Sequence, residues 1–397
     1  MKYNIAKVLT VIIALFLSSC EKDPTSVGGD LLPPNDFINL ITVNSTTEGW
    51  YQSSKSFQGS SENFGRSEKL LLGSHTGITS SLLINPYVVI PDSAFNALSA
   101  DSLNVLSAWM EFQPVYTWGD SNSTFDFSAF QINKYWQHND FDSDSLSALD
   151  FDNNNIASQI QVSDSLITFN IRPDIVQGWL NSRVDSTLPE HFGLLLKPSA
   201  STDKIIGFPA SNGNQFGAVP TLKIVIERPG EYVDTLETTI IREDVHVVEG
   251  ILPDVGTKNI LLQSGLLGRG MLKFDLTKIP AKAVINKATL FVDVDSSLTK
   301  YGNPILDSLE VALFTDSSDL QVVDSTIAPI YLLRNGNVFS GEIHTLLQVL
   351  VNGNDNNGFR LKLTNEERAV DRLVLNGSTA VDTANRPKLI ITYTSTK

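Results

Sequence analysis

Two stretches of this chain, "EKLLLGSHTGITSSLLINPYVVIP" at residues 68–91 and "KNILLQSGLLGRGMLKFDLTKIP" at residues 258–280, follow the same plan. Each has an apolar run, a turn rich in Gly and Ser, a second apolar run and a closing Ile-Pro. Two further pairs of segments match in the same order, residues 176–198 with 347–363 and residues 220–227 with 387–394. Because similar blocks recur in one order, the sequence predicts a duplicated domain.

Within each repeat, apolar residues alternate with polar ones, as they do in half-buried strands. Ala288, Leu290 and Val292 face one way in such a run, and the residues between them face the other. Turns rich in Gly, Pro, Asn and Asp separate the runs, which favours antiparallel strands over βαβ units. We therefore predict an all-β fold of two tandem antiparallel β-sandwich domains, jelly-roll-like, each with one short helix.

The short helix of each repeat is predicted from apolar residues spaced three and four apart. Asp174 is expected to cap the first helix. The predicted apolar faces are Ile175, Val176, Trp179 and Leu180 in the first repeat, and Ile343, Leu346, Leu347, Leu350 and Val351 in the second. Trp179 aligns with Leu350, so we expect this tryptophan to lie in the core.

A Pro-Gly break at residues 228–230 is the predicted boundary between the two domains. The expected units are a signal peptide at 1–19, a lipidated cysteine with a flexible tether at 20–36, a first domain at 37–228 and a second at 229–397. Sixteen residues of tether after Cys20 reach at most ~55 Å when extended. The folded part is thus expected close to a membrane surface.

The first twenty residues read as an export signal, with Lys2 and Lys7 before the apolar run of residues 8–17. Ten residues rise only ~15 Å as a helix, so the run is too short to span a hydrocarbon core of ~30 Å. Leu17-Ser18-Ser19-Cys20 resembles the bacterial lipobox, which implies lipid attachment at Cys20 and a membrane partner through that anchor. The alternative is a plain signal peptide with an unrelated cysteine.

The balance of charge argues against some partners. The chain has 29 Lys and Arg against 44 Asp and Glu, a net charge of −15. No cluster of Lys and Arg is present to bind phosphates, which argues against nucleic acid or anionic lipid headgroups as the main partner. Cys20 is the one cysteine, which excludes disulfides and every cysteine-based metal site or nucleophile.

A family resemblance is carried by "RGMLKFDLTKIPAKAVINKATLFVDV", "LVNGNDNNGFRLKL" and "RPKLIITYT" in the second repeat. These segments resemble DNRLRE-type β-sandwich domains, which are related to disaggregatase and to some carbohydrate-binding modules. The first repeat resembles them more loosely, since it has no match for Arg269 and carries extra residues, "DSAFNALSA", after Pro91. The resemblance implies an extracellular module, with sugar binding as one property of the family.

The start of the mature chain, "CEKDPTSVGGDLLPP", is similar to that of many surface lipoproteins of the Bacteroidetes type. Acidic residues directly after the cysteine imply display at the outer surface. The expected location is therefore the bacterial cell envelope, lipid-anchored, at the outer membrane and on its exposed face.

Residues for catalysis are not evident. The five histidines lie apart in sequence, so no HExxH or His-x-His motif exists, and no cofactor motif is present. Asp140, Asp142 and Asp144 stand at alternate positions in an acidic stretch and are candidates for a Ca²⁺ site, although an EF-hand would need other residues at Ser145 and Phe151. The alternative is a solvated loop.

All five tryptophans lie in the first repeat. Ala108, Met110 and Phe112 align with inward residues of the second repeat, which leaves Trp109 on the other face. Tyr116 and Trp118 follow in an expected loop. Exposed aromatic rings stack on sugars and occur at interfaces, so Trp109, Tyr116 and Trp118 are candidate ligand-binding residues. The alternative is that a second sheet or the other domain covers Trp109.

The sequence favours a non-catalytic surface protein that acts in adhesion or binds glycan or another envelope protein. Two other classes of function stay open. One is a polysaccharide lyase or glycoside hydrolase with paired carboxylates, or an accessory module of such an enzyme. The other is a scaffold of an envelope complex.

Overall fold

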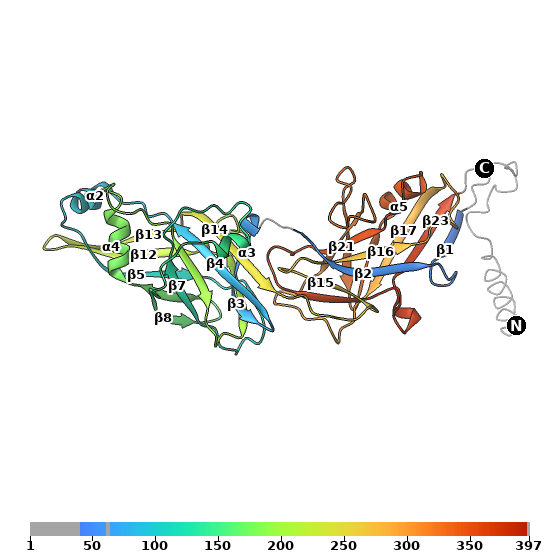
Figure 1. The fold of residues 1–397 in the computed structure, drawn as a ribbon, viewed down its shortest axis with the longest axis horizontal. Coiled ribbons are helices and arrows are strands. Elements are labelled where there is room, and N and C mark those ends of the chain that lie inside the picture. Colours follow the sequence, from blue (N-terminus) through green and yellow to red (C-terminus); the bar gives the residue numbers. More distant parts are fainter. Residues whose placement is uncertain (1–39, 61–63, 395–397) are drawn as a thin grey trace, which may run out of the picture.

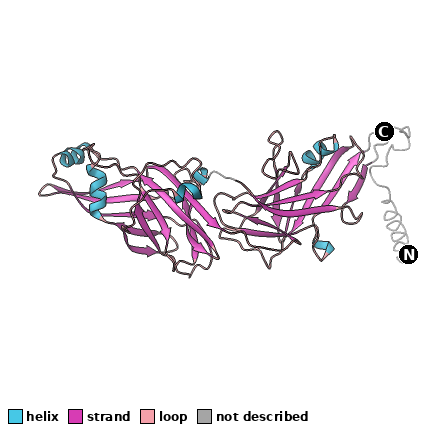
Figure 2. Ribbon diagram, viewed as in Figure 1, coloured by secondary structure: helices cyan, strands magenta, loops and turns pink. Residues whose placement is uncertain are grey.

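The computed structural model describes residues 40–60 and 64–394, and over these ranges antiparallel strands dominate. Figure 2 shows two bodies of strands arranged end to end, with a few short helices at their margins. This confirms the predicted all-β fold of antiparallel sandwiches. Cys20 and the tether of residues 20–36 lie outside the described residues. Within the described ranges, no helix is both long and apolar enough to cross a membrane.

The first sandwich has two separate sheets. One sheet has seven strands: six follow the order β6-β11-β3-β4-β10-β7, and the seventh, β14, also pairs with β4. The other sheet has five strands in the order β13-β12-β5-β9-β8. The strands are β3 (Lys69–His75), β4 (Ile78–Pro86), β5 (Asn104–Phe112), β6 (Tyr116–Trp118), β7 (Phe127–Gln131), β8 (Ala157–Val162), β9 (Ile167–Ile171), β10 (Leu194–Pro198), β11 (Lys204–Pro209), β12 (Thr221–Arg228), β13 (Tyr232–Thr238) and β14 (Ile241–Gly250).

The second sandwich is one continuous sheet of eleven strands, in the order β1-β23-β17-β20-β19-β18-β21-β16-β15-β22, with β2 paired to β16. Strand β19 pairs with both β20 and β18, so it joins the two halves of the sandwich. The strands are β1 (Leu40–Asn44), β2 (Gln52–Gln58), β15 (Asn259–Gln263), β16 (Gly268–Phe274), β17 (Val284–Asp293), β18 (Ser308–Leu313), β19 (Ile330–Asn335), β20 (Val338–Glu342), β21 (Phe359–Leu363), β22 (Arg372–Asn376) and β23 (Lys388–Thr394).

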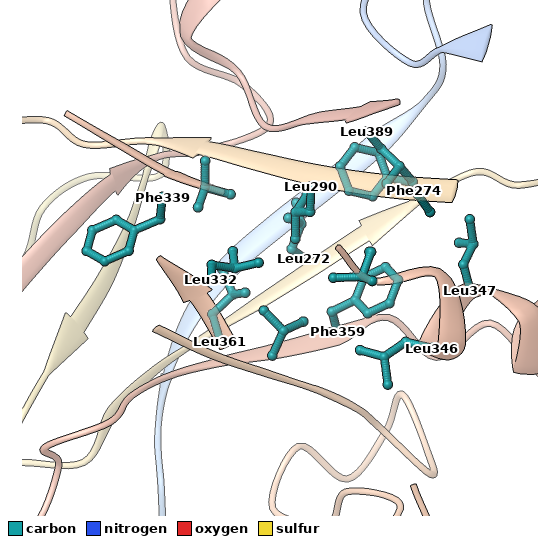
Figure 3. Packing of buried hydrophobic residues seen from close by; sticks show 14 of the residues in the cluster. Leu272, Phe274, Leu290, Leu332, Phe339, Leu346, Leu347, Phe359, Leu361 and Leu389 are labelled. Carbon is teal, nitrogen blue, oxygen red and sulfur yellow. The ribbon is translucent and has the colours of Figure 1, made fainter. Parts of the chain in front are cut away.

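Each sandwich encloses one apolar core, made from alternate residues of its strands. In β17, Ala288, Leu290 and Val292 are fully buried, as their alternation predicts. Figure 3 shows the second core, in which Phe274, Leu290, Leu361 and Leu389 from separate strands point toward one another. With no disulfide predicted, burial of this apolar area is the main stabilising contribution.

The predicted duplication appears in the strand pairing. The pairs β3·β4, β4·β10, β10·β7, β11·β3, β12·β5 and β5·β9 of the first sandwich correspond to β15·β16, β16·β21, β21·β18, β22·β15, β23·β17 and β17·β20 of the second. The strand pairing of the two sandwiches differs at two places. Strand β6 pairs with β11 in the first sandwich, whereas β22, the counterpart of β11, pairs among the described strands with β15 only. Strand β8 pairs with β9 alone, whereas its counterpart β19 continues to β18.

Helices α4 (Pro173–Asn181) and α5 (His344–Val351) occupy the predicted positions in the two repeats. Trp179 is buried in the first core, as expected. Asp174 is not the cap, because the helix begins one residue earlier at Pro173 and Asp174 instead pairs with Arg172. The first sandwich has more helix than the predicted single one, with α2 (Asp92–Ser99), α3 (Ser143–Ser147) and the 3-10 helix η3 (Phe64–Arg66); a 3-10 helix η4 (Thr383–Asn385) lies in the second.

Strand pairing places the domain boundary elsewhere than residue 228. Strand β13 follows β12 through a tight hairpin and β14 pairs with β4, so the first sandwich extends to Gly250. Strands β1 and β2 pair with β23 and β16, so residues 40–58 belong to the second sandwich rather than to the first. A Pro-Gly turn marks a hairpin as readily as a linker, which is why the sequence pattern misplaced the boundary.

Candidate binding surface

The outer face of the five-stranded sheet carries Trp109 near its middle. In β5, Ala108, Met110 and Phe112 point into the core while Trp109 is partly exposed on the opposite face, as predicted. The neighbours of β5 alternate in the same way, with Leu222 and Ile224 of β12 and Phe169 of β9 buried. Polar side chains of all five strands therefore share one surface with the indole.

The strand register sets these side chains in a row across the sheet. Trp109 stands opposite Lys223 of β12 on one side and Asn170 of β9 on the other. Lys223 in turn faces Glu237 of β13, and Asn170 faces Ser158 of β8. We call this row, Glu237-Lys223-Trp109-Asn170-Ser158, the tryptophan row.

Hydrogen bonds hold the tryptophan row in place. The indole Nε1 of Trp109 donates to Oε1 of Glu111 at 2.8 Å, and Nζ of Lys223 lies 3.2 Å from the same oxygen. Asn170 donates to Oε1 of Gln159 at 2.7 Å. A ring fixed at its edge keeps its orientation at little further entropic cost, which suits stacking against a flat ligand.

Tyr116 and Trp118 do not join this surface. The expectation that they lie exposed beside Trp109 is wrong, because Tyr116 is 3% and Trp118 1% exposed. Both belong to the short strand β6 of the other sheet and lie in a buried cluster that the two sandwiches share. Their buried cluster also contains Leu266, Ala369 and Val370 of the second sandwich.

The contact between the sandwiches is also polar. Thr117 and Asn303 exchange backbone hydrogen bonds of 3.1 and 2.9 Å across it. Gly302 lies so close that a Cβ there would stand 2.3 Å from Cε2 of Tyr116, so a glycine is required at this point. Arg368 and Glu68 form an ion pair across the same contact. Nothing in a single-sequence pattern indicated that these segments meet.

The acidic stretch is not arranged around a cation. Asp142 caps α3, and its Oδ1 accepts hydrogen bonds from the backbone N–H and the hydroxyl of Ser145, which lower the pKa of the carboxyl. Asp144 lies in the first turn of the same helix, and Asp140 precedes it with a positive φ. In the described ranges, no three His, Cys, Asp or Glu side chains are grouped to hold a metal ion. The calcium site predicted at these aspartates therefore has no geometric support.

The histidines are dispersed. His75 pairs with Asp203, His138 with Glu243 and His344 with Glu342, each at a separate place. His191 stacks on Trp179 with ring centroids 4.8 Å apart. Burial lowers the pKa of His191 to about 4 and that of His246 to about 3. Buried neutral rings of this kind are part of the packing.

Known proteins resemble this chain only weakly. No family model and no curated protein matches the sequence. A solved structure of the C-terminal domain of the AgI/II polypeptide BspA of Streptococcus agalactiae is 10% identical, with 87% of this chain and 91% of that chain covered and a TM-score of 0.17. A second structure, BspA_C_WT, is also 10% identical over 86% of this chain and 91% of its own, at the same TM-score. A likeness this weak carries no argument, and the resemblance to DNRLRE-type domains stays a prediction.

Proposed function

We propose that this chain is a non-catalytic, lipid-anchored protein of the bacterial cell surface that binds glycan through the tryptophan row. The observation that carries the proposal is the pairing of the first described strand with the last. Leu40 of β1 stands opposite Thr394 of β23, at the end of the second sandwich that lies farthest from the first (Figure 1).

This pairing predicts how the two sandwiches are oriented relative to the membrane. A lipid on Cys20 is separated from β1 by about twenty residues only, so the second sandwich would stand next to the membrane. The first sandwich, although earlier in sequence, would then be the one held away from the membrane. The tryptophan row belongs to that outer sandwich.

The chemistry of the tryptophan row suits a sugar. A sugar ring has one apolar face that stacks on indole and an edge of hydroxyls that need hydrogen-bond partners. Carboxylate, ammonium and amide groups of Glu111, Lys223 and Asn170 surround Trp109 and offer both donors and acceptors. A catalytic role is not favoured, because Glu111 already pairs with Lys223 and Asn170 already bonds to Gln159.

Membrane fractionation tests the anchor. The Cys20→Ser variant should be released from the membrane while the unaltered chain stays with it, because the chain then has no lipid to hold it. A variant that remains in the washed membrane fraction would contradict the lipid anchor.

A glycan array tests the ligand. The full chain with Cys20→Ser should bind a subset of glycans, and adding Trp109→Ala should weaken that binding by ~1–3 kcal/mol, as for a central aromatic contact. The matched control is Tyr331→Ala, which removes an exposed aromatic ring of the second sandwich. Equal binding by both variants, or no binding by the parent chain, would contradict glycan recognition at the tryptophan row.

A further inference from the structure

Residues 40–58, which we call the donor segment, complete a sandwich to which they are not adjacent in sequence. Their strand β1 pairs with β23 and their strand β2 pairs with β16. In the first sandwich, β13 pairs with β12 and β14 pairs with β4. Since β12 corresponds to β23 and β4 to β16, the strand pairs β1–β2 and β13–β14 fill equivalent places.

The two sandwiches obtain this strand pair by different routes. Strand β13 continues from β12 through a hairpin at residues 228–232, so the first sandwich is completed by its own continuous chain. In the second sandwich the corresponding place beside β23 is taken by β1, which comes from the other end of the described chain. This strand pair precedes the whole first sandwich in sequence, yet it lies on the second sandwich (Figure 1).

The donor segment is held by contacts that depend on its sequence and not on its covalent connection. Backbone pairing runs from Leu40 to Asn44 on β23 and from Gln52 to Gln58 on β16. Two of its residues, Ser45 and Trp50, are buried, and Trp50 enters the core of the second sandwich. Side-chain bonds add to this ladder, such as Ser45 Oγ with the backbone N–H of Leu389 at 2.9 Å.

An identical donor segment from a second copy would make every one of these bonds. We infer that the acceptor surface on β16 and β23 also takes residues 40–58 of a second copy of this chain, so that neighbouring copies exchange donor segments. Exchange of identical elements leaves the bonds of the folded state unchanged, and the cost that remains is the entropy of association. The balance between closed monomer and exchanged dimer is therefore set by local concentration.

The test uses cysteines at Thr42 and Thr392, which stand directly opposite each other with their hydroxyl oxygens 2.9 Å apart. One batch of full chain carries T42C and another carries T392C, both with Cys20→Ser. The two batches are unfolded together, refolded over a range of concentrations and oxidised. Only a donor segment docked on another copy brings the two cysteines together, so a disulfide-linked dimer should form. While monomer remains in large excess, the ratio of dimer to monomer should rise about tenfold for each tenfold rise in concentration.

The control places the cysteines in the hairpin of the first sandwich. Val225 and Thr235 are also cross-strand partners, but a tight turn joins their strands. Separate V225C and T235C batches should give no dimer above the background of each batch alone. The double variant T42C/T392C in one chain should form an internal disulfide, which shows that the pair can bond.

The chain that carries Cys20→Ser as its one substitution, and therefore has no cysteine, provides a second measurement. After refolding at high concentration it should yield a dimer that persists on dilution and returns to monomer only after unfolding, measured by light scattering on a sizing column. A chain that stays monomeric at every concentration, together with no T42C–T392C dimer above the hairpin control, would overturn the inference.

Discussion

The hydroxyl of Tyr116 in the first sandwich donates a hydrogen bond of 3.1 Å to Oδ1 of Asp371 in the second. The same phenolic oxygen accepts a bond of 3.1 Å from the backbone N–H of Val370. Asp371 is fully buried, and its other bonds come from the backbone of Gly302 and the amide of Asn365. Burial raises the pKa of Asp371 and, together with the Asp371 charge, raises that of Tyr116. A polar group buried so completely fixes the two sandwiches in one orientation, since it is costly to leave unpaired.

Removing that hydroxyl should loosen the contact between the sandwiches. Tyr116→Phe leaves the Val370 N–H without its partner and costs Asp371 one donor, so the free energy of unfolding should fall by ~1–3 kcal/mol. Denaturant unfolding measures the loss, and small-angle scattering measures the spread of domain orientations. Tyr135→Phe is the matched control, because Tyr135 is 60% exposed and its hydroxyl bonds only to Gln137 in the described chain. A loss no larger than that of the control would mean that the contact rests on apolar packing alone.

Truncating a residue near the amino terminus should destabilise the carboxy-terminal sandwich. Trp50 lies in the donor segment but packs in the second core, so Trp50→Ala should cost ~3–5 kcal/mol of stability there. Hydrogen exchange should show the loss of protection in β16 and β23 and not in β5 or β12. The neighbouring Tyr51, 73% exposed, gives the control Tyr51→Ala with little expected effect. Loss of protection confined to the first sandwich would contradict the strand pairing.

Acid should destabilise the first sandwich through its buried histidines. His191 and His246 bind a proton in the unfolded chain near pH 6.5, but in the folded chain only near pH 4 and pH 3, because burial opposes the charge. The unfolded state therefore binds more protons between these values, and stability falls as the pH drops below 6.5. At pH 5 each histidine should account for about 2 kcal/mol of lost stability relative to pH 8.

Replacing one of these rings should reduce that acid sensitivity. His246 has no hydrogen-bond partner for either ring nitrogen among the described residues, so His246→Leu removes the titrating group without breaking a described bond. Denaturant unfolding at pH 8 and pH 5 should show a smaller drop for this variant than for the parent chain. His344→Gln, at an exposed position, serves as the control. An unchanged pH dependence in His246→Leu would show that this histidine is not the source.

Sequence periodicity predicted the features that depend on neighbours along the chain. Alternation placed Trp109 outside and Met110 inside, and helical spacing placed Trp179 in the core, because each follows from the local strand or helix. The repeated sequence blocks predicted the shared strand order, because each block forms the same local strands in both halves. The burial of Tyr116 and Trp118 could not be predicted in this way, since the cluster that holds them includes residues of the other sandwich. The docking of β1 on β23 depends on partners 350 residues apart, for which a single sequence carries no signal.

The two tryptophans that the sequence grouped together should now respond in opposite ways to truncation. Trp118 is 1% exposed in the cluster between the sandwiches, so Trp118→Ala leaves a cavity and should cost ~3–5 kcal/mol of stability. Trp109 lies on the outer face, where the indole makes its one described hydrogen bond to Glu111, so Trp109→Ala should change stability by about 1 kcal/mol or less. Denaturant unfolding of both variants decides the matter before any ligand is known. A loss for Trp109→Ala as large as that for Trp118→Ala would show that the ring is structural, and the tryptophan row would then have no free face to offer a glycan.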